Sequence, residues 1–208
     1  MINTKILSGK EVSENLKENL SSDIDCLKKE GITPGLAAII VGDNPASKVY
    51  VNSKSKYFSR MGCYSETFCL KENSKELDII KLIEQLNLDE KFHGILLQLP
   101  LPSRLNSDKI LSSIVPQKDV DGFHIDNIGK LFSGKPLYIP CTPNGIIKIL
   151  EYYDIETSGK HAVIIGRSNI VGLPMFALLA QKFEKGNSTV TMCNSRTPDI
   201  EVFTKQAD

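Results

Sequence analysis

The sequence feature that most limits the fold is a short apolar run that leads directly into an amphipathic segment, over residues 35–62. Residues 35–42 read Gly-Leu-Ala-Ala-Ile-Ile-Val-Gly, and such a run predicts a strand covered on both faces. Asp-Asn-Pro at residues 43–45 then supplies a helix cap and a first-turn proline, and Gly62 is placed to end the helix. Apolar residues recur between them at helical spacing: Val51, Tyr57, Phe58 and Met61. The segment therefore predicts a strand–helix step of an α/β fold.

Two residues of this helix, Tyr50 and Lys54, indicate a ligand site. They are four positions apart, so their Cβ atoms should be neighbours at roughly 5–6 Å. An aromatic ring beside an amine, near the carboxyl end of a parallel strand, lies where open α/β sheets bind ligands. The alternative is a surface lysine that covers a half-buried tyrosine.

The rest of the chain repeats the alternation of extended and helical patterns, which predicts parallel sheets with crossover helices. Further strands are expected at residues 64–70, 93–99, 161–166 and 189–193. One helix is expected from Ser8 to Gly31, with a single apolar stripe of Val12, Leu16, Leu20, Ile24 and Leu27. Another is expected from Ser74, with Leu77, Ile80, Ile83 and Leu86 pointing inward. The remaining helices are expected at 106–115, from Thr142-Pro143 with Ile146, Ile149 and Leu150, and around Phe176, Leu178 and Leu179.

The domain organisation follows from one polar segment. A chain of 208 residues can form one large or two small domains. Residues 118–143 are rich in Asp, Gly and Pro, so we expect mostly loop there and a change of domain. We predict a first α/β domain of residues 1–139 and a second, Rossmann-like domain of residues 140–208.

Composition excludes several classes of partner. The formal net charge is zero, so neither nucleic acid nor a membrane surface is indicated, and the apolar runs are too short to span a bilayer. The N-terminal residues carry no signal-peptide pattern. Five cysteines without a Cys-x-x-Cys pair indicate reduced thiols in a cytoplasmic protein, and no metal site is apparent.

A second strand–turn–helix, at residues 161–179, resembles a dinucleotide-binding unit. Gly166 opens the turn, Ser168 replaces the usual second glycine, and Gly172 comes six positions after the first rather than five. Backbone N–H groups at the start of that helix, Val171 among them, would face a pyrophosphate. A glycine turn of an ordinary α/β protein is the alternative.

The charges around this turn favour NADP over NAD. The next strand ends in Asn194-Ser195-Arg196-Thr197 and offers no acidic residue for a ribose hydroxyl. Ser195, Arg196 and Arg167 instead supply a hydroxyl and two cations that suit the phosphate of NADP. A solvated loop residue is the alternative for Arg196.

Taken together, five ordered motifs resemble the bifunctional methylenetetrahydrofolate dehydrogenase/methenyltetrahydrofolate cyclohydrolase family, often called FolD. They read VGDNPASKVYVNSK from Val41, GILLQLPLP from Gly94, KDVDGFH from Lys118, PCTPNG from Pro140 and GRSNIVGLP from Gly166. The resemblance extends from about residue 5 to the last residue. Ile125 stands where the family usually has proline, and Asn194 where it often has histidine.

The resemblance implies roles for the site residues. Lys54 would be the acid/base group of the cyclohydrolase step, with its pKa lowered by an apolar pocket and its amine held by the amide oxygen of Gln98. Tyr50 would stack on the folate rings, and Asp121 would accept hydrogen bonds from the pterin, with Asp119 as its rival. Three further substrate-pocket residues are Leu99, Pro100 and Pro102.

The resemblance also implies the activity and the assembly. We expect NADP-dependent oxidation of methylenetetrahydrofolate, hydrolysis of the methenyl product to formyltetrahydrofolate, an active site in a cleft between two domains, a homodimer, and a place in purine biosynthesis. One alternative is an NADP-dependent reductase of a different small substrate.

The other alternative concerns the end of the chain. In the family, the final Ala-Asp begins another strand of the nucleotide domain, so we expect this chain to be a C-terminally truncated copy. Such a copy would be poorly stable and would retain cyclohydrolase activity only, or none.

Overall fold

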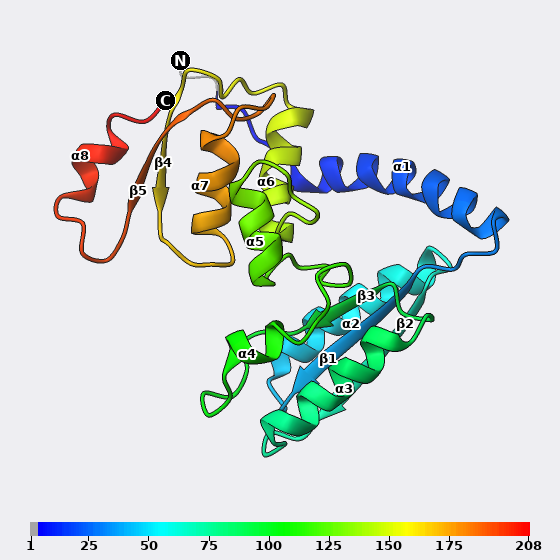
Figure 1. The fold of residues 1–208 in the computed structure, drawn as a ribbon. Coiled ribbons are helices and arrows are strands. Elements are labelled where there is room, and N and C mark those ends of the chain that lie inside the picture. The colour runs from blue at the N-terminus through cyan, green and yellow to red at the C-terminus, as the bar shows by residue number, and fades with distance from the viewer. Residues whose placement is uncertain (1–3) are drawn as a thin grey trace. The chain divides into compact units, whose positions relative to one another are not determined.

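This computed structural model describes residues 4–208 (Figure 1). Backbone contacts divide the chain into two compact units. One is Lys17–Val120, and the other is Asp121–Asp208 together with the residues up to Leu16. We call them the 17–120 unit and the 121–208 unit. Helix α1 (Gly9–Lys29) contributes residues to both. We predicted a folate-binding domain of residues 1–139 and an NADP-binding domain of residues 140–208. The two compact units do not test that assignment of ligands, and it stays a prediction.

The 17–120 unit alternates strands and helices. Its elements are β1 (Gly35–Val41), α2 (Pro45–Arg60), β2 (Tyr64–Leu70), α3 (Glu76–Leu88), β3 (Gly94–Leu97) and α4 (Ser107–Leu111). The strands form a three-stranded sheet in the order β2-β1-β3, and both pairings are parallel. The predicted parallel sheet with crossover helices is therefore confirmed for this unit.

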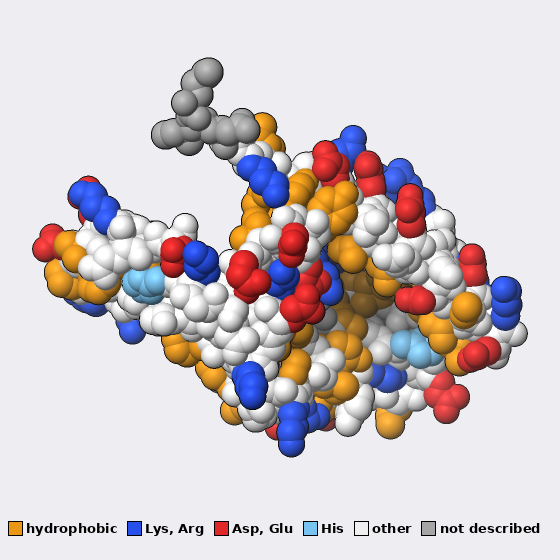
Figure 2. Space-filling view, turned by 90° about the horizontal axis from the view of Figure 1, so that it is seen from above, with side chains coloured by type: hydrophobic (Ala, Val, Ile, Leu, Met, Phe, Trp, Pro, Cys, Tyr) orange, Lys and Arg blue, Asp and Glu red, His pale blue; other side chains and the backbone are white. Residues whose placement is uncertain are grey.

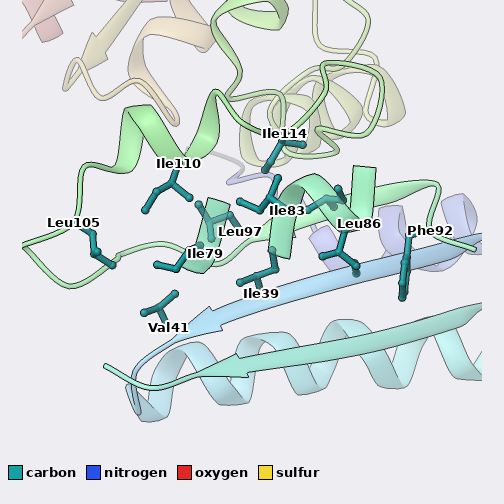
Figure 3. Packing of buried hydrophobic residues seen from close by; sticks show 12 residues of the cluster. Ile39, Val41, Ile79, Ile83, Leu86, Phe92, Leu97, Leu105, Ile110 and Ile114 are labelled. Carbon is teal, nitrogen blue, oxygen red and sulfur yellow. The ribbon is translucent and has the colours of Figure 1, made fainter. Parts of the chain in front are cut away.

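Strand β1 forms the centre of this unit, because all of its residues are buried. One set of alternating residues, which includes Ile39 and Val41, packs against α3 and α4 (Figure 3). The other set, Leu36, Ala38 and Ile40, packs with Val51 of α2. This period-two division is what a strand covered on both faces requires.

The start and end of α2 follow the sequence signals. The side-chain oxygen of Asn44 accepts hydrogen bonds from the backbone N–H groups of Ala46 and Ser47, at 2.9 and 3.2 Å. Pro45 occupies the first turn, where its missing N–H costs nothing. Gly62 follows the C-terminal cap with a φ of 65°, a conformation that glycine adopts without strain.

The 121–208 unit holds α5 (Ile125–Phe132), α6 (Cys141–Tyr152), β4 (His161–Ile165), α7 (Gly172–Ala180), β5 (Thr189–Cys193) and α8 (Ile200–Thr204). Strands β4 and β5 pair in parallel, as expected for a strand–helix–strand unit. The core of the unit is built mainly from α5, α6 and α7. Its buried residues are Leu131, Ile147, Met175, Ala177, Leu178 and Leu179.

Several sequence expectations about helices were wrong. The segment 118–143 is mostly loop, as predicted, but it contains a helix that the sequence did not predict, α5, where the His124 ring accepts from the N–H of Asp126. Helix α3 starts at Glu76 rather than at Ser74. Ile83 and Leu86 are buried as predicted, but Ile79 is buried as well and Leu77 is exposed. Helix α4 ends earlier than predicted.

Two further helices differ from expectation in detail. Helix α6 begins at Cys141 with Pro140 as its cap, so Thr142 lies inside the helix and does not cap it. The buried residues of α6 are Pro143 and Ile147, and Ile146 is 36% exposed. Of the stripe predicted on α1, only Val12 is buried.

The surface carries charges of both signs, as the zero formal net charge suggests, and the cysteines are unpaired. Lys and Arg side chains are interspersed with Asp and Glu side chains on the face shown in Figure 2. All five cysteines are free thiols, as predicted. Within residues 4–208, no helix is long and apolar enough to cross a membrane, and no group of three or more His, Cys, Asp or Glu residues is arranged to hold a metal ion.

Candidate functional site

Helix α2 brings Tyr50 and Lys54 together. The Lys54 ammonium lies over the Tyr50 ring, with Nζ 4.8 Å from the ring centroid. Lys54 is half-buried and Tyr50 keeps 57% of its surface exposed, so neither side chain is enclosed by an apolar pocket. The arrangement provides an aromatic surface and an amine that a bound molecule can reach.

The rest of α2 fixes where this pair stands. Val51 is fully buried against β1, which determines which face of the helix points inward. The hydroxyl of Ser55, next to Lys54, lies 3.2 Å from the Ser65 hydroxyl and 3.5 Å from the Thr67 hydroxyl, both on β2. The pair is therefore carried by a helix that is attached to two strands of the sheet.

Gln98 lies directly beyond the carboxyl end of β3. Its backbone N–H donates to the Ile39 carbonyl at 2.9 Å, and its side-chain Nε2 donates to the Leu99 carbonyl at 2.7 Å. Its Oε1 atom is buried and accepts no hydrogen bond. The predicted bond from Lys54 to this oxygen is therefore absent, and the Lys54 ammonium lies over the Tyr50 ring. The adjoining Leu99–Pro100 peptide bond is cis.

The two rival aspartates differ in accessibility. Asp119 is only 2% exposed, and its backbone forms a parallel bridge with Ile95 of β3. Asp121 is half-buried, and the Cys141 thiol donates to its Oδ1 atom at 3.7 Å. An accessible carboxylate can meet a ligand, whereas a buried one serves the packing of its own segment, so the geometry favours Asp121.

The loop that carries Asp121 rests on the start of α6. Gly122 has a φ of 70°, and a Cβ atom there would lie 3.3 Å from atoms of Pro140 and from the Tyr138 carbonyl oxygen. Only glycine combines this backbone conformation with so close an approach. Gly122 therefore holds Asp121 beside the first residues of α6.

The glycine turn between β4 and α7 has the close packing of a nucleotide-binding turn. A Cβ atom on Gly172 would collide with the Gly166 carbonyl, lying 2.8 Å from its carbon. Gly166 has a φ of 123° and open space where a side chain would be. The Ser168 hydroxyl accepts from the N–H groups of Val171 and Gly172, at 3.1 and 3.3 Å. Those two N–H groups therefore have an acceptor within the turn, and their expected role at a pyrophosphate stays a prediction.

The predicted NADP-selecting residues gather at one edge of the two-stranded sheet. Arg167 follows β4, while Ser195 and Arg196 follow β5, and the two strand ends are joined by a bond from the Gly166 N–H to the Cys193 carbonyl at 2.8 Å. The turn after β5 is fixed by the Arg196 N–H, which donates to the Asn194 side chain at 3.0 Å. All three side chains are exposed. These features fit a phosphorylated dinucleotide.

Sequence reasoning did not single out three residues that position the site: Ser55, Gly122 and Cys141. Gly122 and Cys141 lie within the motifs of the sequence, but their contact partners are about 20 residues away along the chain. Ser55 has no motif signal beyond being a small polar residue on the inward side of α2.

The sequence matches two family descriptions. Residues 7–121 match the tetrahydrofolate dehydrogenase/cyclohydrolase catalytic domain, and residues 140–208 match the NAD(P)-binding domain of the same name. The bifunctional protein FolD of Acetivibrio thermocellus is 48% identical over 204 residues, which cover 98% of this chain and 70% of the relative. That of Lysinibacillus sphaericus is 46% identical over 207 residues, which cover 100% of this chain and 72% of the relative.

Solved structures agree with these matches. The bifunctional FolD enzyme from Campylobacter jejuni superposes with a TM-score of 0.93 at 46% identity, over 98% of this chain and 71% of that one. The Trypanosoma brucei methylenetetrahydrofolate dehydrogenase–cyclohydrolase, solved with NADP and an inhibitor, gives a TM-score of 0.93 at 31% identity, over 100% of this chain and 71% of that one.

Proposed function

This chain belongs to the tetrahydrofolate dehydrogenase/cyclohydrolase family, and from that membership we propose which of its residues carry each reaction. The family indicated by the five sequence motifs is thereby confirmed, and the alternative of an NADP-dependent reductase of a different small substrate is set aside. The chain is an enzyme of folate one-carbon metabolism. Its reactions are the oxidation of methylenetetrahydrofolate and the hydrolysis of the methenyl product to formyltetrahydrofolate.

The hydrolytic step depends on Lys54. Water adds to the cationic methenyl carbon, the ring opens, and a positioned amine takes up and returns the protons that move. The observation that supports this role most directly is the Lys54 ammonium over the Tyr50 ring, at 4.8 Å on the accessible face of α2. Tyr50 presents a flat apolar surface on which the folate rings stack.

Gln98 acts beside Lys54 as an acceptor. Its Nε2 atom donates to the Leu99 carbonyl, and this bond fixes the direction in which the side-chain oxygen, Oε1, points. A buried amide oxygen without a donor is costly, so a donor that reaches it when substrate binds is favoured. We assign that donor to the Lys54 ammonium once the folate rings take its place over Tyr50. Leu99 and Pro100 line the pocket next to it.

Asp121 recognises the pterin. The amino-pyrimidine edge presents two adjacent N–H donors, and a carboxylate matches them with its two oxygens. The half-buried Asp121 fits this role better than the buried Asp119.

The cofactor is NADP, which supplies the hydride acceptor of the dehydrogenase step. Gly166, Ser168, Val171 and Gly172 shape the turn that approaches the pyrophosphate, and Arg167, Ser195 and Arg196 recognise the additional phosphate. We assign nucleotide binding to residues 140–208 and folate chemistry to residues 1–139. A cytoplasmic homodimer that supplies formyl groups for purine biosynthesis is part of the same proposal, by analogy with the family.

Replacing Lys54 tests the assignment. Lys54→Met keeps the length and packing of the side chain and removes the amine, so the methenyl-hydrolysing rate should fall by roughly 10²–10⁴-fold. The rate is followed by the absorbance of methenyltetrahydrofolate, with and without NADP. Lys56→Met, an exposed lysine two positions along α2, is the matched control and should hydrolyse normally. A Lys54→Met enzyme with a near wild-type hydrolytic rate would show that the assignment is wrong.

A further inference from the structure

We propose that Ser55 is a positioning residue for Lys54, and that its hydroxyl fixes the rotation of α2 from which the Lys54 amine reaches the substrate. The inference rests on the proposed function, in which Lys54 carries the hydrolytic step. A contact of three hydroxyls between α2 and β2 motivates it. Ser55 Oγ lies 3.2 Å from Ser65 Oγ and 3.5 Å from Thr67 Oγ1, and all three side chains are half-buried.

The two strands beneath α2 turn different kinds of side chain towards it. Leu36 and Ala38 of β1 pack with Val51 of α2, so they lie on the face of the sheet that this helix covers. Ser65 of β2 is the register partner of Leu36. Thr67 is the register partner of Ala38, so both hydroxyls lie on that same face. The helix therefore rests on apolar side chains over β1 and on hydroxyls over β2.

Attachment to both strands restrains α2 more than attachment to one. Val51 and Ser55 are four positions apart, so they lie on one face of the helix. Val51 is fully buried in the cluster with β1, and Ser55 contacts β2. Apolar packing has no preferred direction, so Val51 alone would allow the helix to roll about its axis. Hydrogen bonds between hydroxyls depend on direction, and the Ser55 contacts therefore oppose that roll.

The rotation of α2 matters because Lys54 precedes Ser55 in the sequence. Consecutive residues are about 100° apart around the helix axis, so a fixed Ser55 side chain fixes the direction in which Lys54 leaves the helix. The ammonium of an extended lysine lies roughly 8 Å from that axis, and a roll of roughly 10° moves it by about 1 Å. Whatever the ammonium contacts, its reach starts from this direction.

The predicted effect of losing the hydroxyl is on the chemical step. A catalytic group displaced by about 1 Å can lower a rate by roughly 10²-fold. Val51 still packs in Ser55→Ala and limits the displacement, so kcat for hydrolysis should fall by roughly three- to thirtyfold. Stacking of flat rings tolerates a small sideways shift, so KM should change little. The affinity for NADP should not change.

The experiment measures kcat and KM for methenyltetrahydrofolate hydrolysis on the full chain, with rates normalised to the folded fraction from circular dichroism. Ser55→Ala should show the fall in kcat, and Ser55→Thr, which keeps a hydroxyl, should restore most of it. Ser53→Ala is the matched control. It removes an exposed hydroxyl from the residue on the other side of Lys54 in the sequence, and its kcat should equal that of the wild type.

The hydroxyls of β2 give a second measurement that leaves α2 unaltered. Ser65→Ala combined with Thr67→Val removes both partners of Ser55, so this β2 variant should lose as much kcat as Ser55→Ala. Adding Ser55→Ala to the β2 variant should cause no further loss, because the contacts are already absent.

Several results would overturn the inference. They are a wild-type kcat in Ser55→Ala, a Ser55→Thr variant as slow as Ser55→Ala, and losses that add when Ser55→Ala is combined with the β2 variant. A less stable Ser55→Ala protein whose folded fraction hydrolyses normally would show that the contact is structural only, which also overturns it.

The proposed function can fail separately from this inference. If Lys54→Met loses hydrolysis while Ser55→Ala keeps it, only the positioning role of Ser55 is wrong. If Lys54→Met hydrolyses at a near wild-type rate, or the unaltered chain does not hydrolyse the substrate, the proposed function fails and this inference fails with it.

Discussion

The two sheets of the molecule place their functional residues by different means. In the 17–120 unit, β1 is buried along its whole length and pairs with a strand on each side, and α2 packs on it through Val51. In the 121–208 unit, β4 and β5 form a two-stranded sheet in which Ala162, Ile164 and Val190 pack on the core while Ile165 is 63% exposed.

This difference matches the kind of chemistry assigned to each unit. General acid–base catalysis requires a side chain held at a defined position, and α2 is fixed by a core packed on both faces of its sheet. Nucleotide binding relies on the backbone, and the turn at Gly166 obtains its shape from the close approach of Gly172 rather than from deep burial. The comparison predicts that substitutions at equivalent strand positions will differ in cost between the units.

The largest effect should come from the buried strand. Ile39→Ala removes a fully buried side chain of β1 and leaves a cavity, so the free energy of unfolding should drop by about 2–5 kcal/mol. The matched change, Ile165→Ala on β4, should alter it by less than about 0.5 kcal/mol, because that side chain is mostly in solvent. Urea denaturation of both variants measures the difference. Equal losses would remove the contrast between the two sheets.

An intermediate effect should come from the cations at the end of β5. Arg196→Ala should weaken NADP binding by roughly ten- to a hundredfold and leave NAD binding almost unchanged, since one charge-assisted contact is worth about 1.5–3 kcal/mol. Titration calorimetry with both nucleotides gives the two affinities. Lys182→Ala, another exposed cation of the 121–208 unit, should change neither. A parallel loss for NAD and NADP would argue against recognition of the additional phosphate.

The smallest effect should be a loss of stability of the 17–120 unit at acid pH. Glu76 on α3 accepts from Nζ of Lys109, on α4, at 2.7 Å and from the N–H of Asn106, the cap of α4, at 3.1 Å. These bonds hold the pKa of Glu76 below its usual value of 4.5, and the bond from Lys109 has the larger effect. The ionised group therefore stabilises the fold above pH 4.5, and this contribution is lost as the pH falls through the lowered pKa.

Glu76→Gln removes that titration. Thermal melts at a series of pH values should show a small advantage of the wild type at neutral pH that shrinks under acid conditions. Exposure to solvent keeps the effect small, because water screens the pair. A constant difference between the two proteins at every pH would contradict the assigned cause.

The sequence predicted those parts of the fold that depend on local pattern. The strands β1 and β2 and the caps of α2 follow from apolar runs and from Asn44, Pro45 and Gly62, so they could be placed without the structure. Helix α5 was missed because Gly129 and the surrounding Asp and Gly residues resemble a loop, and the His124 cap is not a common capping residue.

For the candidate site, the sequence supplied a set of residues but not their arrangement. Tyr50 and Lys54 are related by helix periodicity, so their contact could be expected. Gln98 and Lys54 belong to different elements, and the rotamer that turns Nε2 of Gln98 towards Leu99 depends on packing that spacing does not encode. The contact between Cys141 and Asp121 likewise requires the loop at Gly122 to fold back on α6.

The complete burial of β1 also bears on how such a protein diverges over evolutionary time. Nearly every substitution within that strand costs stability, so variants that alter it are removed by selection before they can change the chemistry. Residues 43–54 and 98–100 follow the ends of strands, and many of them face solvent. New substrate preferences should therefore arise in these short segments, while the strand that supports them changes slowly.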